Sequence, residues 1–376
     1  MQRIGIAATA AAAALTLVQS PASTQPPTTA ATGPASWTAP SCTRVTGDGS
    51  VTFTTDDGRT LAPTTGTLKA TGYTHGLVAL DTPGTLLATH NDALLRSTDA
   101  GCGWQRVATL GSASVRLAAA PGGRAFAWQK NGRYLARVDG TTVTPLKAPT
   151  ARVSGLGTDR ARPGHVRLAG SDGQLYDSVD GGATWRRVGT PAFGGTASVY
   201  GVAFDPADPD HAVAGGMAAG GAVTTDGGVT WRAARGLSAD GGRANLFDAA
   251  VSPADPSVVY ALGIDLVEAA PGSSSEGRHL YRSTDGGLTY AKAVDDSAAV
   301  KLTNGTLLAP SPVDAKVLHF AYGTYFQNYG TDLFRYDAST GRVTATHNAY
   351  DGVSAIAFNP ARPEVMYLGV EEVRVD

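Results

Sequence analysis

The sequence predicts an all-β protein: a single seven-bladed β-propeller with its ring closed by pairing of the N-terminal and C-terminal strands. Three observations predict this fold. A short motif recurs at intervals of about 40 to 60 residues, apolar strands end in proline turns, and no long amphipathic helical pattern is present. The 376 residues include 47 glycines and 21 prolines, as expected for many short strands joined by turns. We assign residues 41–376 to this one domain.

The recurring motif has Ser or Thr, Asp and Gly at alternate positions and usually ends in an aromatic residue. Clear copies lie at residues 97–104, 178–185, 224–231 and 283–290, and a weaker copy lies at 54–61. Their repeated residues include Asp56, Asp99, Asp180, Trp185, Asp226, Trp231 and Asp285. Two degenerate copies around Asp139 and Asp337 continue the spacing. Seven markers therefore predict seven small sheets.

The motif has the chemistry of a tight hairpin turn. Its hydroxyl and carboxylate groups accept hydrogen bonds from nearby backbone N–H groups, and its Gly supplies a positive φ. Its Trp is expected to pack the hairpin against the next sheet. Because similar turns in seven sheets cannot all line one site, we interpret the repeated aspartates as structural.

A second phrase predicts the innermost strands. Residues 199–209, 247–256 and 353–363 each combine a small-residue apolar strand with a proline turn, which suits the crowded centre of a propeller. The segment 365–375 supplies strands with no motif after them, whereas 51–61 opens the domain with a degenerate motif. We expect these two ends to pair within one blade, which leaves no sheet edge open.

The N-terminal residues predict export. Residues 1–23 combine one positive charge, an Ala-rich apolar run and small residues suited to cleavage, so we interpret them as a signal peptide. Residues 24–40 form a Pro/Thr-rich arm or pro-segment expected to be disordered. We expect the mature protein to be secreted and extracellular. In that compartment, Cys42 and Cys102 are predicted to form one disulfide.

Composition argues against several classes of function. A net charge of −2 with scattered Lys and Arg residues predicts neither nucleic-acid nor membrane binding. The seven histidines lack metal-ligand spacing, so we predict no metal and no cofactor. The few glutamates do not form an evident catalytic pair. We therefore expect a monomeric protein that is not an enzyme.

The segment 320–330 stands out because it holds five aromatic residues. Phe320 and Tyr322 are expected to complete a buried strand, whereas Tyr325, Phe326 and Tyr329 fall in the loop that follows. Exposed aromatic rings are typical anchors of protein contacts. Alternatively, the loop folds back and caps the ring with its own aromatic side chains.

The repeated turns resemble those of the Asp-box, or BNR-repeat, β-propellers, a class that includes hydrolases, receptors and non-enzymatic assembly factors. The Ala-rich leader, the Pro/Thr arm, the cysteine pair and the loop from Tyr325 to Tyr329 together resemble secreted Asp-box propellers that provoke autolysis of neutral metalloproteases of the thermolysin and dispase class. This resemblance implies that Phe326 is the hydrophobic contact. It also implies a transglutaminase partner, with Gln327 as the acyl donor. The alternatives are a generic extracellular protein- or glycan-binding propeller and a sialidase or other glycoside hydrolase.

Overall fold

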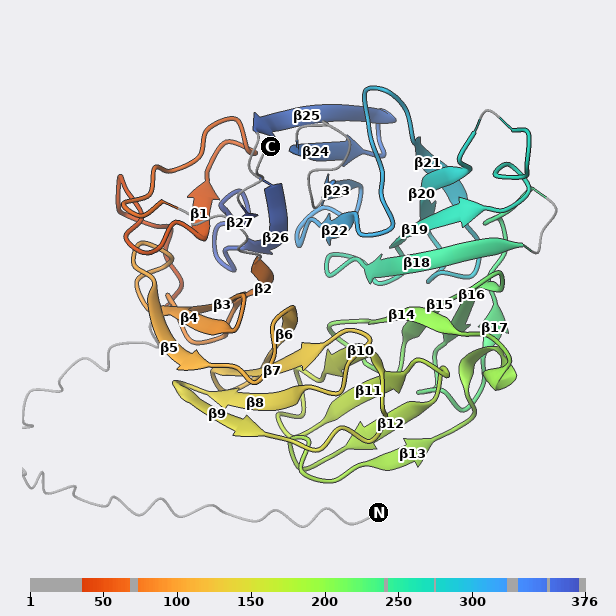
Figure 1. Cartoon of the computed structure of the whole chain (residues 1–376), viewed down its shortest axis with the longest axis horizontal. Coiled ribbons are helices and arrows are strands. Elements are labelled where there is room, and N and C mark those ends of the chain that lie inside the picture. Colours follow the sequence, from red (N-terminus) through yellow and green to blue (C-terminus); the bar gives the residue numbers. More distant parts are fainter. Residues whose placement is uncertain are drawn as a thin grey trace, which may run out of the picture. The chain divides into compact units, whose positions relative to one another are not determined.

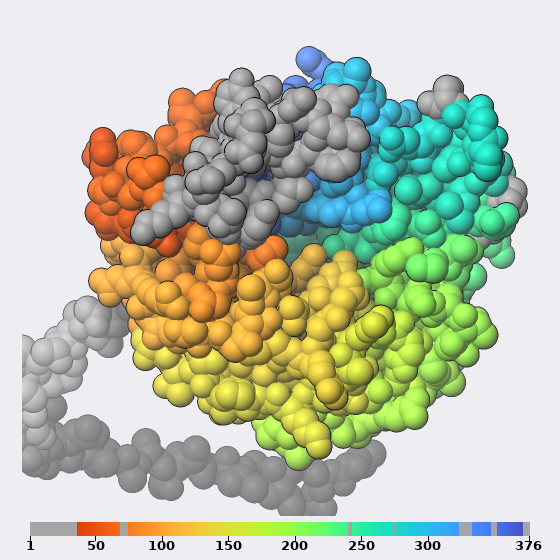
Figure 2. All heavy atoms as spheres, viewed as in Figure 1, coloured from red at the N-terminus to blue at the C-terminus, as the bar shows by residue number. Residues whose placement is uncertain are grey.

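The computed structural model is a ring of antiparallel sheets, as the motif spacing predicted (Figure 1). It describes residues 36–67, 74–239, 243–273, 275–322, 331–349 and 352–371. Within these residues, six sheets have four strands and one has three. We number the sheets as blades 1 to 7 in the order of their first strands. From blade 1 to blade 5, side chains of neighbouring blades fill the seams of the ring (Figure 2).

The strands of each blade follow one another along the chain in the first three blades. Blade 1 contains β2 (Thr74–Ala79), β3 (Leu86–His90), β4 (Ala93–Ser97) and β5 (Gln105–Thr109). Blade 2 contains β6 (Val115–Ala120), β7 (Arg124–Gln129), β8 (Leu135–Asp139) and β9 (Thr142–Pro145). Blade 3 contains β10 (Val153–Thr158), β11 (Val166–Gly170), β12 (Leu175–Ser178) and β13 (Arg186–Val188), followed by the short 3-10 helix η1 (Ala192–Gly195).

The same order continues in the next three blades, and the last blade combines both ends of the domain. Blade 4 contains β14 (Val199–Phe204), β15 (Ala212–Gly216), β16 (Gly220–Thr224) and β17 (Arg232–Ala233). Blade 5 contains β18 (Ala244–Val251), β19 (Val259–Asp265), β20 (Arg278–Ser283) and β21 (Ala291–Asp295). Blade 6 contains β22 (Leu307–Pro310), β23 (Val317–Ala321), β24 (Thr331–Asp337) and β25 (Arg342–Ala349). Blade 7 contains β26 (Gly352–Phe358), β27 (Met366–Glu371) and β1 (Val51–Thr54).

The predicted inner strands are confirmed. The three small-residue phrases form β14, β18 and β26, each the first strand of its blade. The strand that follows the second phrase, β19, is almost wholly buried. No helix within the described ranges is long and apolar enough to cross a membrane.

Strand direction gives the ring two different faces. All seven repeat aspartates lie at the turn between the third and fourth strand positions of a blade, on the same face as the turns between first and second strands. We call this the box face. The loops between second and third strands, and the connections between blades, lie on the opposite face, which we call the loop face.

Five of the repeated turns share one hydrogen-bond pattern. In blade 1, Ser97 Oγ donates to Asp99 Oδ1 at 2.8 Å, and the backbone N–H groups of Gly101 and Gly103 donate to Ser97 Oγ and Asp99 at 3.0 and 2.8 Å. The corresponding hydroxyl-to-carboxylate bonds occur at Asp56, Asp180, Asp226 and Asp285. Hydrogen bonds from the following Thr side chain and backbone lower the pKa of Asp180 and of Asp226 to about 2. The turns therefore hold ionised carboxylates as hydrogen-bond acceptors.

The same turns join neighbouring blades, and they do so toward the preceding blade. A Cβ on Gly101, which has a φ of +91°, would lie 2.6 Å from the ring of Tyr367 in blade 7. Trp231 Nε1 likewise donates to Thr190 O, beyond the last strand of blade 3. The prediction that each Trp packs against the next sheet was thus wrong, because Trp231 contacts the preceding blade. Each turn lies close against the blade before it, where only a residue without a side chain fits.

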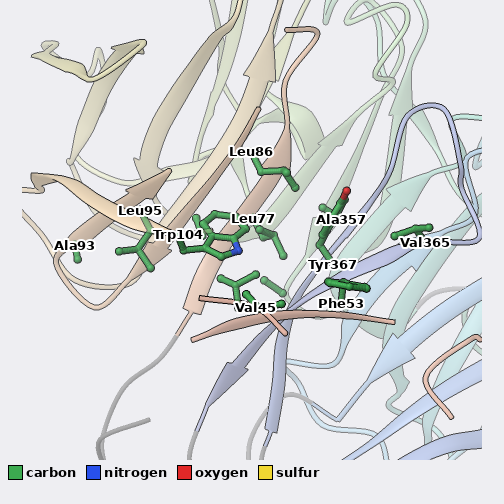
Figure 3. Close-up of a cluster of buried hydrophobic side chains, with 13 residues drawn as sticks. Val45, Phe53, Leu77, Leu86, Ala93, Leu95, Trp104, Ala357, Val365 and Tyr367 are labelled. Carbon is green, nitrogen blue, oxygen red and sulfur yellow. The ribbon is translucent and has the colours of Figure 1, made fainter. Parts of the chain in front are cut away.

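Blade 7 closes the ring with strands from both ends of the domain. β1 pairs antiparallel with β27, from Val51 opposite Gly369 to Thr54 opposite Met366, which confirms the predicted pairing. The Tyr367 hydroxyl donates to Ala100 O of blade 1 at 3.0 Å and accepts from Asn359 Nδ2 at 2.9 Å. The apolar cluster at this seam joins residues of blades 1 and 7 around Trp104 (Figure 3).

The N-terminal arm seals the same seam. The predicted disulfide between Cys42 and Cys102 is present and ties the arm to the repeated turn of blade 1. Trp37 Nε1 donates to Leu80 O at 3.0 Å, and Thr46 bridges to Gly103. Residues 36–46, which comprise the end of the predicted arm and the first residues of the domain, therefore run along the box face between the first and last blades.

We expect the double variant Cys42→Ser, Cys102→Ser to lower the free energy of unfolding by about 2–4 kcal/mol, because the disulfide closes a long loop in the unfolded chain. The separation of 60 residues places it among the more stabilising bridges. Urea denaturation of both proteins measures the effect. Reduction of the native protein is the control and should shift the midpoint equally. An unchanged midpoint in the double variant would show that the seam holds without the bridge.

Candidate binding surface on the loop face

The aromatic segment singled out in the sequence begins at the loop face of blade 6. Phe320 lies in β23 and is fully buried, and its ring stacks on Phe334 with centroids 5.0 Å apart. Tyr322 is also buried, so the expectation of a buried strand end is confirmed. The predicted contact and acyl-donor residues Tyr325, Phe326, Gln327 and Tyr329 lie outside the described residues.

A cavity of about 760 Å³ lies at the loop-face end of the central channel. Its apolar part comes from the inner strands of several blades, with Leu77, Leu117, Leu156 and Ile356 among the lining residues. Tyr322 also lines it, and the Tyr322 carbonyl accepts a hydrogen bond from Thr303 Oγ1 at 3.1 Å. The base of the predicted loop therefore borders the cavity.

A charged cluster crosses the channel beside the cavity. Lys130, in the loop that follows β7 of blade 2, reaches β18 of blade 5. There Lys130 Nζ donates to Phe247 O and to Asp248 Oδ2, each at 3.3 Å. Arg116 approaches the same carboxylate oxygen at 3.7 Å, and its guanidinium lies 5.8 Å from the ring centroid of Trp128. We call Arg116, Lys130 and Asp248 the channel clamp.

Two cations hold the Asp248 carboxylate ionised. Burial favours the neutral acid, but attraction to Lys130 and Arg116 outweighs burial and lowers the pKa of Asp248. For Lys130, burial is the stronger influence and lowers its pKa, and the attraction of Asp248 offsets burial only in part. The clamp thus joins blades 2 and 5 through partly buried charges with hydrogen-bond partners.

The other acids of the cavity lining are also paired. Arg278 lies 3.3 Å from Glu276, and Lys301 lies 3.2 Å from Asp296. The part of the chain that the structure describes brings together no three His, Cys, Asp or Glu side chains able to hold a metal ion. Glycoside hydrolysis needs two carboxylates acting as acid and as base or nucleophile. Each acid in this lining is instead engaged by a cation.

Sequence reasoning missed the channel clamp. Asp248 interrupts an otherwise apolar inner strand, Phe247–Val251, and this was the available signal, because an isolated charge on a buried strand needs a partner. Nothing in the sequence identified Lys130 as that partner, since it lies 118 residues away along the chain.

Comparison with known proteins gives one strong match and several distant ones. No family model matches the chain. It is 71% identical over 376 residues, the full length of both proteins, to the dispase autolysis-inducing protein of Streptomyces mobaraensis. The structure titled YCF48 bound to D1 peptide matches with a TM-score of 0.55 and 13% identity, over 82% of this chain and 95% of that one. The GH74 xyloglucanase of Xanthomonas campestris matches with a TM-score of 0.52 and 18% identity, over 72% of this chain.

These matches differ in what they show. The chain covers 46% of the xyloglucanase, less than half its length, and identity this low shows the fold alone. Fold, cavity and comparisons define the protein as a seven-bladed β-propeller. At 71% identity over its whole length, the chain belongs to the family of the dispase autolysis-inducing protein. That relative is named for an effect on a protease rather than for a reaction it catalyses.

We expect Lys130→Met to lower the free energy of unfolding by about 1–3 kcal/mol, because it removes the cation that spans the channel and leaves Phe247 O and Asp248 short of a donor. Arg133→Met, in the same loop but exposed and without an ion pair to a described acid, is the matched control and should change stability by less than about 0.5 kcal/mol. Urea denaturation compares the two. Equal stability of both variants would show that the clamp does not stabilise the ring.

Proposed function

We propose that this protein binds a neutral metalloprotease of the dispase class and promotes its autolysis. The observation that carries this proposal is the 71% identity to the dispase autolysis-inducing protein over the full length of both chains. The low-identity matches to GH74 enzymes carry no argument for catalysis. The protein therefore acts by binding, and the protease supplies the chemistry.

We also propose that the protein is secreted, with residues 1–23 as its signal peptide and residues 24–40 as an arm preceding the domain. The disulfide supports this, because such bonds persist in oxidising compartments. Export would place the protein in the same compartment as a secreted protease.

The mechanism is a shift in the population of protease conformations. A folded protease opens locally and rarely, and a second protease molecule can cut only the opened form. A binder that prefers the opened form raises its population and with it the rate of cutting. A preference of about 2.7 kcal/mol corresponds to roughly a hundredfold change in that population.

The contact site of this proposal is the loop face of blade 6. Tyr325, Phe326 and Tyr329 connect two strands of one sheet, β23 and β24, whose bases are fixed by the stacked rings of Phe320 and Phe334. Aromatic residues on a rigid base give contact area at small entropic cost. Phe326 is the central anchor in this proposal.

We expect Phe326→Ala to slow the loss of intact protease at least tenfold, because it removes the apolar anchor of the contact. Purified mature protein is incubated with dispase, and intact protease and proteolytic activity are followed over time. Val313→Ala is the matched control. It truncates an apolar residue of the same blade that is 69% exposed on the box face, and it should leave the time course unchanged.

Two outcomes would count against these proposals separately. If the native protein leaves dispase intact, promotion of autolysis is wrong for this chain. If autolysis proceeds equally with the native protein and with Phe326→Ala, the protein has the activity but the contact lies elsewhere.

We further propose that a transglutaminase modifies the protein at Gln327, which the sequence resemblance implies as the acyl donor and which lies in the connection between β23 and β24. Gln327→Asn is expected to remove most incorporation of a fluorescent amine by microbial transglutaminase. Gln105→Asn is the control and should have no effect, since Gln105 is held within β5. Unchanged labelling of Gln327→Asn, with label mapped to Gln25 or another glutamine, would overturn this assignment.

A further inference from the structure

Positive charge is concentrated in two of the seven blades. Residues 124–187, in blades 2 and 3, contain 11 Lys and Arg residues and 5 Asp residues, a net charge of +6. Since the whole chain has a formal charge of −2, the remainder carries −8. The chain is therefore close to neutral overall but strongly asymmetric.

Most basic residues of this stretch have acidic partners within the fold. Asp139 binds Arg124 at 2.6 Å and Arg137 at 2.7 Å. Asp177 accepts from Arg167 and Arg186, and Asp159 accepts from Arg162 at 2.6 Å. With Lys130, which pairs with Asp248, these residues account for six of the eleven cations, and their charges are offset within the fold.

The other five basic residues form no ion pair with a described acid: Arg160 and Arg187, and three residues on the loop face. Arg133 lies in the loop between β7 and β8, and Lys147 and Arg152 lie in the connection from β9 to β10. All three are exposed, and none forms an ion pair with any acid that the structure describes. We call them the cationic patch.

The backbone brings these residues together. Val153 N–H donates to Gly132 O at 3.0 Å, which places Arg152 beside the loop that carries Arg133. Leu146 N–H donates to Leu135 O at 2.9 Å, which fixes the start of the connection that carries Lys147. Three uncompensated cations therefore lie on hydrogen-bonded backbone, on the same face as the cavity and Tyr322.

We infer that the cationic patch is an electrostatic docking surface for an acidic region of the target protease. This inference rests on the proposed function and deepens it by naming the chemistry of the partner. Exposed rim charges add little to final affinity, but they steer a partner of opposite charge and raise the association rate. The patch brings the protease to the loop face, where the contact with blade 6 then forms.

The test measures how the onset rate of autolysis depends on salt, using dispase as the probe at about 0.05 and 0.5 M NaCl. The triple variant Arg133→Glu, Lys147→Glu, Arg152→Glu reverses the patch. The control triple variant Arg160→Glu, Lys316→Glu, Arg342→Glu makes the same charge change at three exposed positions on the box face. Thermal melting tests whether each variant is folded. If the patch variant is not folded, Lys147→Ala takes its place.

We expect the native rate to fall on the order of tenfold as salt rises, since the Debye length shortens from about 14 Å to about 4 Å over this range. The patch variant should be slow at low salt and become faster as salt rises, because its reversed charges repel an acidic partner until salt screens them, whereas the control should follow the native protein. Equal rates for the native protein and the patch variant at low salt would overturn the inference while leaving the proposed function intact. A native rate that rises with salt would also overturn it, because it would indicate repulsion. Failure of the native protein to promote autolysis at either salt concentration would instead contradict the proposed function.

Discussion

The fold depends on closure of the ring at the seam between blades 7 and 1. Blade 7 has three strands, and one of them, β1, comes from the other end of the domain, so neither terminal segment completes the blade alone. Closure requires two strands from opposite ends of the domain to pair, which makes the contact non-local and entropically costly. Tyr367, the arm and the disulfide all act at this seam, where they offset that cost.

The fold could be predicted from the sequence because the residues that specify each turn are close together in the chain and recur in most blades. A turn such as 97–104 specifies its own hydrogen bonds within eight residues, and the spacing of such turns counts the blades. The direction in which Trp231 packs could not be deduced, because it depends on how successive sheets are placed around the ring. Local chemistry therefore defines each turn, and assembly of the ring defines which neighbour it contacts.

The functional surface was harder to predict because its parts are distant in sequence. The channel clamp joins Lys130 and Asp248 across the ring, and the cavity takes side chains from most of the blades. No spacing rule connects such residues. The cationic patch is a similar case, because its significance depends on which arginines have acidic partners in the folded molecule. A sequence lists charges, but only the fold shows which of them remain uncompensated.

The two faces of the ring give its ends different surroundings. At the N-terminal end, two hydrogen bonds attach the chain to turns on the box face. Trp37 donates to Leu80 O, and Thr38 O accepts from Asn359. At the other end, β27 finishes at Glu371, on the loop face beside the inner strand that lines the cavity. Attachments made to the two ends are therefore not equivalent. A tag or a solid support joined to the N-terminal arm leaves the loop face open to large partners, whereas chain that continues from the end of β27 starts on that face.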